Sequence, residues 1–345
     1  MPLFTVAIPT YNRAHLLPYT LSCLQQQTYR DFEVVISDNA STDNTETVIA
    51  GFCDLRIRYF RQPSFLCATD NWAACADLAH SEWIVFNQDD DVLSPYFLER
   101  CAHAIQAAPK IVMYATEFTC AKDITRNQGA INSGFPFLHC WDRPQPRLIP
   151  GVQMAALSWF TSPFSPPAQA IPTHLFRKHW PRGPAAASLG EHYLNSHVVC
   201  EGMVAFEAYN GAIIRNHADR ASNTTTEGER RRVGVMLVAL GALFQENKLD
   251  WQRALREILL EAPLAYRESI LNDSLFNEFI APEAMEILAT SVATEKGVSP
   301  INYVADLRAE RLKPPPVGRF DRWKIPKPVA RVMRGLLYAA GKDYA

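Results

Sequence analysis

The sequence lacks the features that mark several whole classes of protein. No apolar run among its 345 residues approaches the roughly 20 consecutive apolar residues of a membrane-spanning helix. The first residues also lack the pattern of a signal peptide. The eight cysteines form no CxxC pair and no zinc-ligand spacing with histidine, so we expect reduced, mostly buried thiols. The net charge of −2 argues against nucleic acid as a partner. These absences predict a cytoplasmic globular protein.

Over its first hundred residues, the sequence alternates between segments with the apolar spacing of a strand and segments with the apolar spacing of a helix. Short β-rich runs predict strands at residues 3–9, 32–38, 55–62, 82–88 and 110–118. Runs with helical spacing predict intervening helices at residues 14–27, 70–79 and 94–108, with Asp70 as a cap and Pro95 in the first helical position. Within residues 40–52, cap-type residues precede a short predicted helix that ends near Gly51. Strands alternating with helices indicate an α/β fold with a doubly wound, mostly parallel sheet.

The rest of the chain reads differently. Residues 118–182 are rich in proline, aromatic and turn residues, so we expect irregular, surface-reaching structure there. Residues 229–312 return to helical patterns and predict a helical C-terminal extension. Residues 313–345 begin with a proline-rich linker and close with a basic segment that has an apolar face. That tail would lie on an anionic membrane surface or pack back on the domain, and both interpretations stay open.

Three polar clusters follow three of the predicted strands. They are the stretch 9–13 after the first strand, Asp38 and Asn39 after the second, and the triplet 89–91 after the fourth. In a parallel sheet ligands bind outside the carboxyl ends of the strands. The clusters therefore predict one binding site at that edge.

The aspartate triplet 89–91 is the most unusual of these clusters, because three adjacent carboxylates repel one another. Such a group suits a hard divalent cation, since Mg²⁺ and Mn²⁺ take oxygen ligands and Mg²⁺ usually binds one or two carboxylates plus substrate phosphates. The alternative is a solvated acidic turn that caps the next helix. Capping needs one aspartate rather than three, and it leaves the other two clusters unexplained.

The motifs together resemble the family 2 glycosyltransferases with a GT-A fold. The resemblance is carried by "TVAIPTYNR", by "SDNASTDNT", in which Asn39 stands where a second Asp is common, and by "FNQDDD", read as a DxD motif. It covers about residues 5–97. It implies an inverting transfer of a sugar from a nucleotide-sugar donor, UDP- or dTDP-linked, with Mn²⁺ or Mg²⁺ as the cofactor.

The resemblance also implies roles for individual residues. It assigns these to the nucleotide-sugar: Pro9, Thr10, Tyr11, Arg13, Asp38, Asn71, Asp89 and Asp90. Asp38 would accept a hydrogen bond from the base, and Asp91 would bind the metal. The "IIRNH" stretch resembles the family's Arg-x-His motif, so His217 would touch the diphosphate or complete the metal shell. For Arg13 and Asn71 a purely structural role at a helix start is an equal alternative.

The catalytic base is expected later in the chain, in "SLGEHYLNSH". This stretch resembles the family's acidic motif, commonly Glu-Asp, which here reads Glu191-His192. A carboxylate at a helix start can point into a cleft, so Glu191 is the predicted base, and His192 is a second candidate because imidazole is a competent base near neutral pH. The alternative is that both are helix-start residues without a role. For Trp159 and Trp180 core packing is favoured over acceptor stacking.

The expected organisation follows from these assignments. Residues 1–225 would form the GT-A domain, with a nucleotide-sugar half at 1–115 and an acceptor half at 116–225, followed by the helical region 226–312 and the tail 313–345. The expected acceptor is a glycan or lipid-linked glycan in surface polysaccharide or lipopolysaccharide assembly. Peripheral contact with the inner face of the membrane and a homo-oligomer both remain open.

Two other functions are weighed against this one. A sugar-nucleotide pyrophosphorylase also uses a doubly wound sheet and acidic metal ligands, but such enzymes open with a glycine-rich phosphate loop, and "AIPTYNRAH" has no glycine. A non-catalytic nucleotide- or carbohydrate-binding module on the same fold is the other alternative. The departures from the family pattern at Asn39 and His192 are what keep it open.

Overall fold

The computed structural model describes most of the chain. The described residues are 1–54, 56–121, 130–131, 146–159, 164–183, 190–215, 237, 239–262, 264–272 and 282–311. His217 and the tail 313–345 lie outside them. The strands are β1 (Phe4–Thr10), β2 (Phe32–Asp38), β3 (Ile57–Arg61), β4 (Trp83–Phe86), β5 (Val92–Leu93), β6 (Ile111–Ala121), β7 (Ala130–Ile131), β8 (Arg147–Pro150), β9 (Gln169–Pro172) and β10 (Met203–Arg215).

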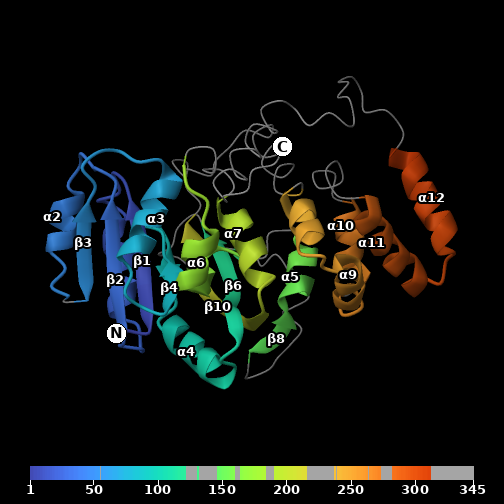
Figure 1. Ribbon diagram of the computed structural model, residues 1–345, viewed down its shortest axis with the longest axis horizontal. Coiled ribbons are helices and arrows are strands. Elements are labelled where there is room, and N and C mark those ends of the chain that lie inside the picture. The colour runs from blue at the N-terminus through green and yellow to red at the C-terminus, as the bar shows by residue number, and fades with distance from the viewer. Residues whose placement is uncertain are drawn as a thin grey trace.

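The helices alternate with these strands in the first half of the chain and dominate its end (Figure 1). They are α1 (Leu17–Gln25), α2 (Thr45–Ala50), α3 (Ala68–Leu78), α4 (Phe97–Ala107), α5 (Gly151–Leu157), α6 (Thr173–His179), α7 (Gly190–Val199), α9 (Trp251–Leu259), α10 (Leu264–Asn272), α11 (Pro282–Glu295) and α12 (Pro300–Arg311). No helix within the described ranges is both long enough and apolar enough to cross a membrane.

One mixed sheet forms the centre of the molecule, with the order β3-β2-β1-β4-β9-β6-β10-β5. Four neighbouring strands at one side are parallel, because β1 pairs in parallel with β2 and β4, and β2 with β3. β6 and β10 form a second parallel pair, and β9 joins the two groups by antiparallel pairing with β4 and β6. The predicted mostly parallel α/β architecture is therefore confirmed.

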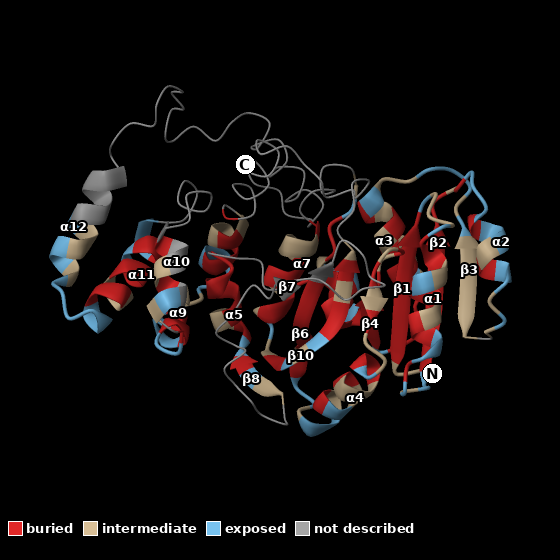
Figure 2. Cartoon of the chain, turned by 180° about the vertical axis from the view of Figure 1, so that it is seen from behind, coloured by how far each residue is buried: buried red, intermediate tan, exposed pale blue. Residues whose placement is uncertain are grey.

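Helices cover both faces of the sheet, as the alternation within β1 requires. Ala7 faces a core that contains Ala73 of α3 and Phe176 of α6. Its neighbour Ile8 faces the opposite core, with Leu17 of α1. Figure 2 shows α1 over β1 and α4 at the lower end of the same face. This two-sided burial explains why these strands read as continuous apolar runs.

Two local predictions in this half are wrong. Cys67, not Asp70, is the N-cap of α3, and the Asp70 carboxylate instead accepts the Gly183 N–H at 2.8 Å. Pro95 precedes α4, whose N-cap is Tyr96, because the preceding residue Ser94 still donates its N–H to the Gly211 carbonyl of β10. In both cases a contact from a distant element, which local pattern does not report, fixes the helix boundary.

The prediction of irregular, surface-reaching structure for residues 118–182 is also wrong for most of the residues of this stretch that the structure describes. β8, α5, β9 and α6 lie in this stretch, and Met154, Leu157 and Phe176 are at most 1% exposed. α5 begins at Gly151, where a Cβ atom would lie 1.6 Å from the Val199 carbonyl oxygen. The elements are only four to seven residues long, so none shows a clear period.

The C-terminal helices continue the core of the α/β domain. Leu255 and Ile258 of α9 and Leu288 of α11 belong to the same buried cluster as Met154 of α5. Asp250 is the N-cap of α9, and its carboxylate accepts the Arg253 N–H at 3.0 Å, the usual side-chain cap of a helix. Figure 1 shows these helices beside α5, at the end of the molecule away from β3.

Six of the cysteines are described with their side chains and are free, as expected from their spacing, but Cys53 is exposed and Cys67 and Cys200 are half-buried, so only half of the six fit the expectation of buried thiols. Cys23, Cys75 and Cys101 are buried, and burial raises the pKa of each thiol. These three side chains therefore behave as small apolar core residues.

Candidate active site

The structure brings the three polar clusters of the sequence to one edge of the sheet. In the parallel register Thr10 lies beside Asp38, and Ala7 lies beside Phe86. The Asn39 N–H then donates to the Thr10 carbonyl at 2.9 Å. The residues that follow β1, β2 and β4 therefore share the carboxyl edge, as the parallel topology requires.

The aspartate triplet forms a turn between β4 and β5 that α1 holds in place. The Thr20 hydroxyl of α1 lies 3.1 Å from the Asp89 carbonyl oxygen and 2.9 Å from that of Asp91. The three side chains differ in exposure: Asp89 is 9% exposed, Asp91 is 1% exposed, and Asp90 is intermediate. Asp90 is thus the carboxylate of the triplet that faces outward most.

The environment of the aspartate turn shifts the pKa of the Asp89 carboxyl group. Burial, with the nearby Asp90 charge added to it, raises the pKa of Asp89 to about 7. The Thr10 hydroxyl, the Arg13 guanidinium and the Tyr11 N–H act in the opposite direction. Arg13 therefore influences the aspartate turn rather than standing apart from it. The turn concentrates negative charge that a bound cation would relieve.

Asp91 connects the turn to the end of β10. Its Oδ1 accepts the Arg215 N–H at 3.0 Å, and Val92 next to it pairs with Ile213. The Arg-x-His stretch begins at Arg215, so the structure brings the start of that motif to the aspartates. His217 itself lies outside the described residues, and its role stays a prediction.

Asp38 lies beneath the edge, with no exposed side-chain surface. Its Oδ1 accepts the Ser41 N–H at 2.9 Å, and its Oδ2 accepts the Tyr59 hydroxyl at 2.6 Å. Arg61 Nη1 lies 3.8 Å from Oδ2. Burial and the bond to Asp38 raise the pKa of Tyr59. The sequence predicts that Asp38 accepts a hydrogen bond from a nucleotide base, and because its side chain has no exposed surface, a neighbouring group would have to move aside first.

Asn71 is engaged with the backbone and side chain of Ser37 in β2. Its Oδ1 accepts the Ser37 hydroxyl at 2.7 Å, and its Nδ2 donates to the Ser37 carbonyl at 3.2 Å. The residue is 4% exposed. These contacts fasten α3 to the sheet, which is a structural role. The predicted donor contact of Asn71 is untested by them.

The residues after β1 form the outer part of the edge. Pro9 and Thr10 are buried in the strand, while Tyr11 is 43% exposed. The chain turns at Asn12, which has a φ of 53° and accepts the Thr42 N–H through its side chain at 2.7 Å. Of the predicted residues 9–11, Tyr11 alone thus offers substantial surface to a ligand.

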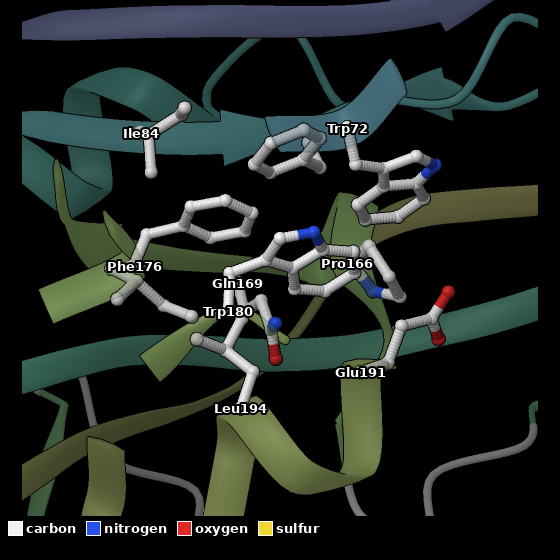
Figure 3. Close-up of a pocket in the computed structure, with 10 residues that line it drawn as sticks. Trp72, Ile84, Pro166, Gln169, Phe176, Trp180, Glu191 and Leu194 are labelled. Carbon is white, nitrogen blue, oxygen red and sulfur yellow. The ribbon is translucent and has the colours of Figure 1, made fainter. Parts of the chain in front are cut away.

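Glu191 stands at the start of α7 and lines a narrow pocket with aromatic walls (Figure 3). Trp72 stacks on Phe86 with ring centroids 4.5 Å apart and on Trp180 at 5.1 Å. Figure 3 shows the Glu191 carboxylate at the Trp72 end of the pocket, away from Ile84. Its predicted exposure to a cleft at a helix start is consistent with this position, and its catalytic role stays a prediction.

The α7 start is shaped by Trp180. A Cβ on Gly190 would lie 2.9 Å from the Trp180 ring, and the indole N–H donates to the Thr69 carbonyl at 2.8 Å. Trp180 and Trp159 are 8% and 5% exposed, so both pack in the core as favoured from the sequence. His192 follows Glu191 on α7 at intermediate exposure.

The aspartate turn offers a donor set that fits a hard divalent cation. Among the described residues, no group of three or more His, Cys, Asp or Glu side chains is arranged to hold a metal by itself. An ion that binds with a diphosphate needs only one or two protein carboxylates. The partly exposed Asp90, next to the buried Asp89 with its raised pKa, meets that requirement.

Sequence reasoning missed three contributors to this edge. Tyr59 donates a hydrogen bond to Asp38, and Thr20 donates one to the aspartate turn. Phe65 lies exposed beside Tyr11. The alternating pattern of residues 57–61 could have placed Tyr59 next to β2, because β2 and β3 pair in register. No sequence signal distinguishes Phe65 from an ordinary loop residue.

The fold and the position of the acidic turn define a GT-A type domain, and comparison with known proteins agrees. Residues 5–159 match the family model described as glycosyl transferase family 2. The matched part of the chain includes the three clusters.

Two relatives illustrate the likeness. A validoxylamine A glucosyltransferase of Streptomyces hygroscopicus subsp. jinggangensis is 39% identical over 121 residues, covering 33% of this chain and 28% of the relative. A GalNAc(5)-diNAcBac-PP-undecaprenol beta-1,3-glucosyltransferase of Campylobacter jejuni is 34% identical over 96 residues, covering 27% of this chain and 31% of the relative. The matched segment thus spans less than a third of either relative.

The likeness in fold extends further along the chain. The structure of S. aureus TarS 1–349 in complex with UDP superposes with a TM-score of 0.58 at 14% identity, covering 94% of each chain. At that identity the comparison establishes the GT-A fold, including its helical end, and nothing finer.

Proposed function

We propose that the chain is an inverting glycosyltransferase that moves a sugar from a UDP- or dTDP-linked donor to a hydroxyl acceptor. The observation that carries this proposal is the acidic turn at the carboxyl end of β4, where a partly exposed Asp90 adjoins a buried Asp89 with a raised pKa. The match to the glycosyl transferase family 2 model supports a transferase over the pyrophosphorylase alternative.

The relatives support the choice of donor and acceptor to test first. One Escherichia coli relative is named a UDP-Glc:alpha-D-GlcNAc-diphosphoundecaprenol beta-1,3-glucosyltransferase, 28% identical over 90 residues. The Campylobacter relative also acts on an undecaprenol-linked glycan by its name. UDP-glucose and a lipid-linked or polysaccharide glycan are therefore the first donor and acceptor to examine.

In the proposed reaction the acceptor oxygen forms a bond to the anomeric carbon while the bond from that carbon to the diphosphate oxygen breaks. Glu191 takes the acceptor proton, and His192 is the alternative base. The nucleoside diphosphate leaves with both electrons of the broken bond. A divalent cation, when bound, supplies Lewis-acid stabilisation of that charge. Arg13, which already acts on the aspartate turn, would contact the phosphates.

Within the triplet, we assign the metal contact to Asp90 rather than to Asp91. Asp91 is 1% exposed, and its Oδ1 is occupied by the Arg215 N–H. A carboxylate enclosed in this way holds β10 in position, whereas Asp90 is accessible from the outside. The sequence-based assignment of Asp91 to the metal is the alternative that the same experiment decides.

The first prediction compares the thermal shifts of two variants with UDP, with and without Mn²⁺. Asp90→Asn should keep the melting temperature of the free protein and lose the Mn²⁺-dependent part of the UDP shift. Asp91→Asn keeps an oxygen that can accept the Arg215 N–H but places an amide NH2 group in a buried position. It should therefore lower the melting temperature of the free protein, since a buried donor without an acceptor costs roughly 1–3 kcal/mol, and should keep a metal-dependent shift. The reverse pattern would assign the metal to Asp91.

Turnover separates the enzyme from the binding module. The wild-type chain should release UDP slowly from UDP-glucose in Mn²⁺, because water replaces the missing acceptor, and EDTA should stop the release. Stabilisation by UDP without any release, over a panel of UDP- and dTDP-sugars, would instead support the non-catalytic module. No stabilisation by any nucleotide would contradict both.

A further inference from the structure

The first turn of α3 is tied to the segment that leads to the proposed base. The Thr69 hydroxyl donates to the Gly183 carbonyl at 2.9 Å, and the Gly183 N–H donates to the Asp70 carboxylate at 2.8 Å. Thr69 is 3% exposed, so its hydrogen bond is shielded from water. Gly183 and Gly190 flank residues 184–189, which lie outside the described part of the chain. One turn of α3 thus holds both backbone polar groups of Gly183.

Trp180 extends this connection from α3 to the start of α7. Its indole N–H donates to the Thr69 carbonyl at 2.8 Å. Its ring stacks on Trp72 and Phe176, with centroid distances of 5.1 and 4.8 Å. Figure 3 shows this ring in the wall of the pocket that Glu191 also lines. Because the ring is stacked on its neighbours and hydrogen-bonded, it has no room to rotate.

Gly190 brings the backbone of α7 directly against that fixed ring. A Cβ atom there would lie 2.9 Å from the Trp180 ring, which is closer than two carbon atoms pack. Glu191 is the next residue and stands in the first turn of α7. The first turn of a helix frays readily, because its N–H groups lack partners within the helix. A fixed position for Glu191 therefore requires packing from outside α7.

We propose that Thr69 and Asp70 are positioning residues for the catalytic base. They act on the start of α7 through Trp180 and Gly183. This inference rests on the proposed function, in which Glu191 takes the acceptor proton. A general base works only within hydrogen-bond reach of the reacting oxygen, and a displacement of about 1 Å can lower a rate by about a hundredfold. Loss of either positioning residue should therefore change the rate of the reaction and not the affinity for UDP.

The test measures Mn²⁺-dependent UDP release from UDP-glucose by the full chain, below the melting temperature of every variant, with kcat and KM determined separately. Thr69→Val keeps the branched shape and removes the hydroxyl, so it should lower kcat by roughly tenfold and leave KM and the dissociation constant of UDP unchanged. Thr69→Ser keeps the hydroxyl and should retain kcat. Asp70→Ala should resemble Thr69→Val, because each removes one of the two bonds to Gly183.

A double-mutant cycle with Glu191→Gln separates positioning from general destabilisation. If Thr69 acts only through the Glu191 carboxylate, Thr69→Val should cause no further loss of rate once that carboxylate is gone. An equal loss of rate in both backgrounds would refute the positioning role, as would a wild-type kcat in Thr69→Val. Either result would leave the proposed function in place.

Asp77→Asn is the matched control at the same junction. Asp77 of α3 pairs with Arg182 at 2.7 Å, and the two side chains are 49% and 54% exposed. An exposed ion pair of this kind contributes little to stability, so kcat should stay at the wild-type value. A fall in kcat as large as that in Thr69→Val would contradict the specific role of Thr69. If the wild type releases no UDP or dTDP from any nucleotide-sugar, the proposed function fails and this inference fails with it.

Discussion

At the scale of single residues, Glu191 is the group on which turnover should depend. It follows the first residue of α7 and lines the aromatic pocket beside Trp72. A positioned base contributes about 10²–10⁴-fold to a proton-transfer step. Glu191→Gln keeps the size and removes the basic oxygen, so it should slow Mn²⁺-dependent UDP release by that factor. The dissociation constant for UDP should not change, because the residue acts on the acceptor side.

His192→Ala provides the adjacent control for this prediction. The His192 carbonyl accepts the Ser196 hydroxyl within α7 at 2.9 Å, a backbone contact that the substitution leaves in place. The variant should retain most of the rate. Loss of turnover in His192→Ala with a retained rate in Glu191→Gln would make the imidazole the base. Both measurements use the nucleotide product, so an unidentified acceptor does not prevent them.

Residue roles were the part of the site that the sequence predicted least well. The sequence located the polar clusters, since a motif at a strand end reports its own position. It did not report that Asp38 is enclosed by Tyr59 and the Ser41 turn, or that Asp91 is held by Arg215. Those facts depend on partners from 3 to 124 positions away along the chain. Asp90 differs from Asp89 and Asp91 in its exposure, which the amino-acid sequence of the motif does not reveal.

At the scale of elements, the prediction of helices and strands was accurate where the apolar residues have a clear helical or strand spacing. β2 was expected at residues 32–38 and is Phe32–Asp38, and α1 lies inside the range 14–27. The prediction for residues 118–182 was wrong because a segment such as β9, which is four residues long and ends in a proline, is too short to show a clear spacing of apolar residues. Such segments are stabilised by tertiary contacts, which outweigh local propensity.

The junction of α5 with the end of α7 gives a sharp test at this scale. A Cβ on Gly151 would lie 1.6 Å from the Val199 carbonyl oxygen and 2.6 Å from that of Gly202. Both obstacles are backbone, so neither can rotate away. Gly151→Ala should destabilise the protein by at least the roughly 1–3 kcal/mol that overpacking costs, measured as a fall in the urea midpoint.

Gly241→Ala serves as the control for that substitution. A Cβ at this helical position meets only the Trp159 ring at 3.6 Å, an ordinary contact. Alanine is favoured over glycine in a helix by about 0.5–1 kcal/mol, so this variant should match or exceed the wild type. If Gly151→Ala is equally stable, the close approach of α5 and α7 is wrong.

At the scale of the whole molecule, the C-terminal helices and the α/β domain share one hydrophobic core. Buried residues of α9 and α11, among them Leu255 and Leu288, cluster with Met154 of α5 and with the core side of the sheet. A helical region that were a separate unit would have its own closed core. The shared cluster implies instead that the chain unfolds as a single cooperative unit over the described residues.

Two truncations test this shared core. A chain of residues 1–312 keeps all the described helices and should unfold in one transition at the wild-type temperature. A chain of residues 1–248 loses α9 to α12 and uncovers the apolar side of α5. It should bind the dye ANS and lose its near-ultraviolet circular dichroism, because specific packing fails when one side of a core is removed. A cooperative transition and wild-type UDP affinity in the shorter chain would show that the helices form an independent domain.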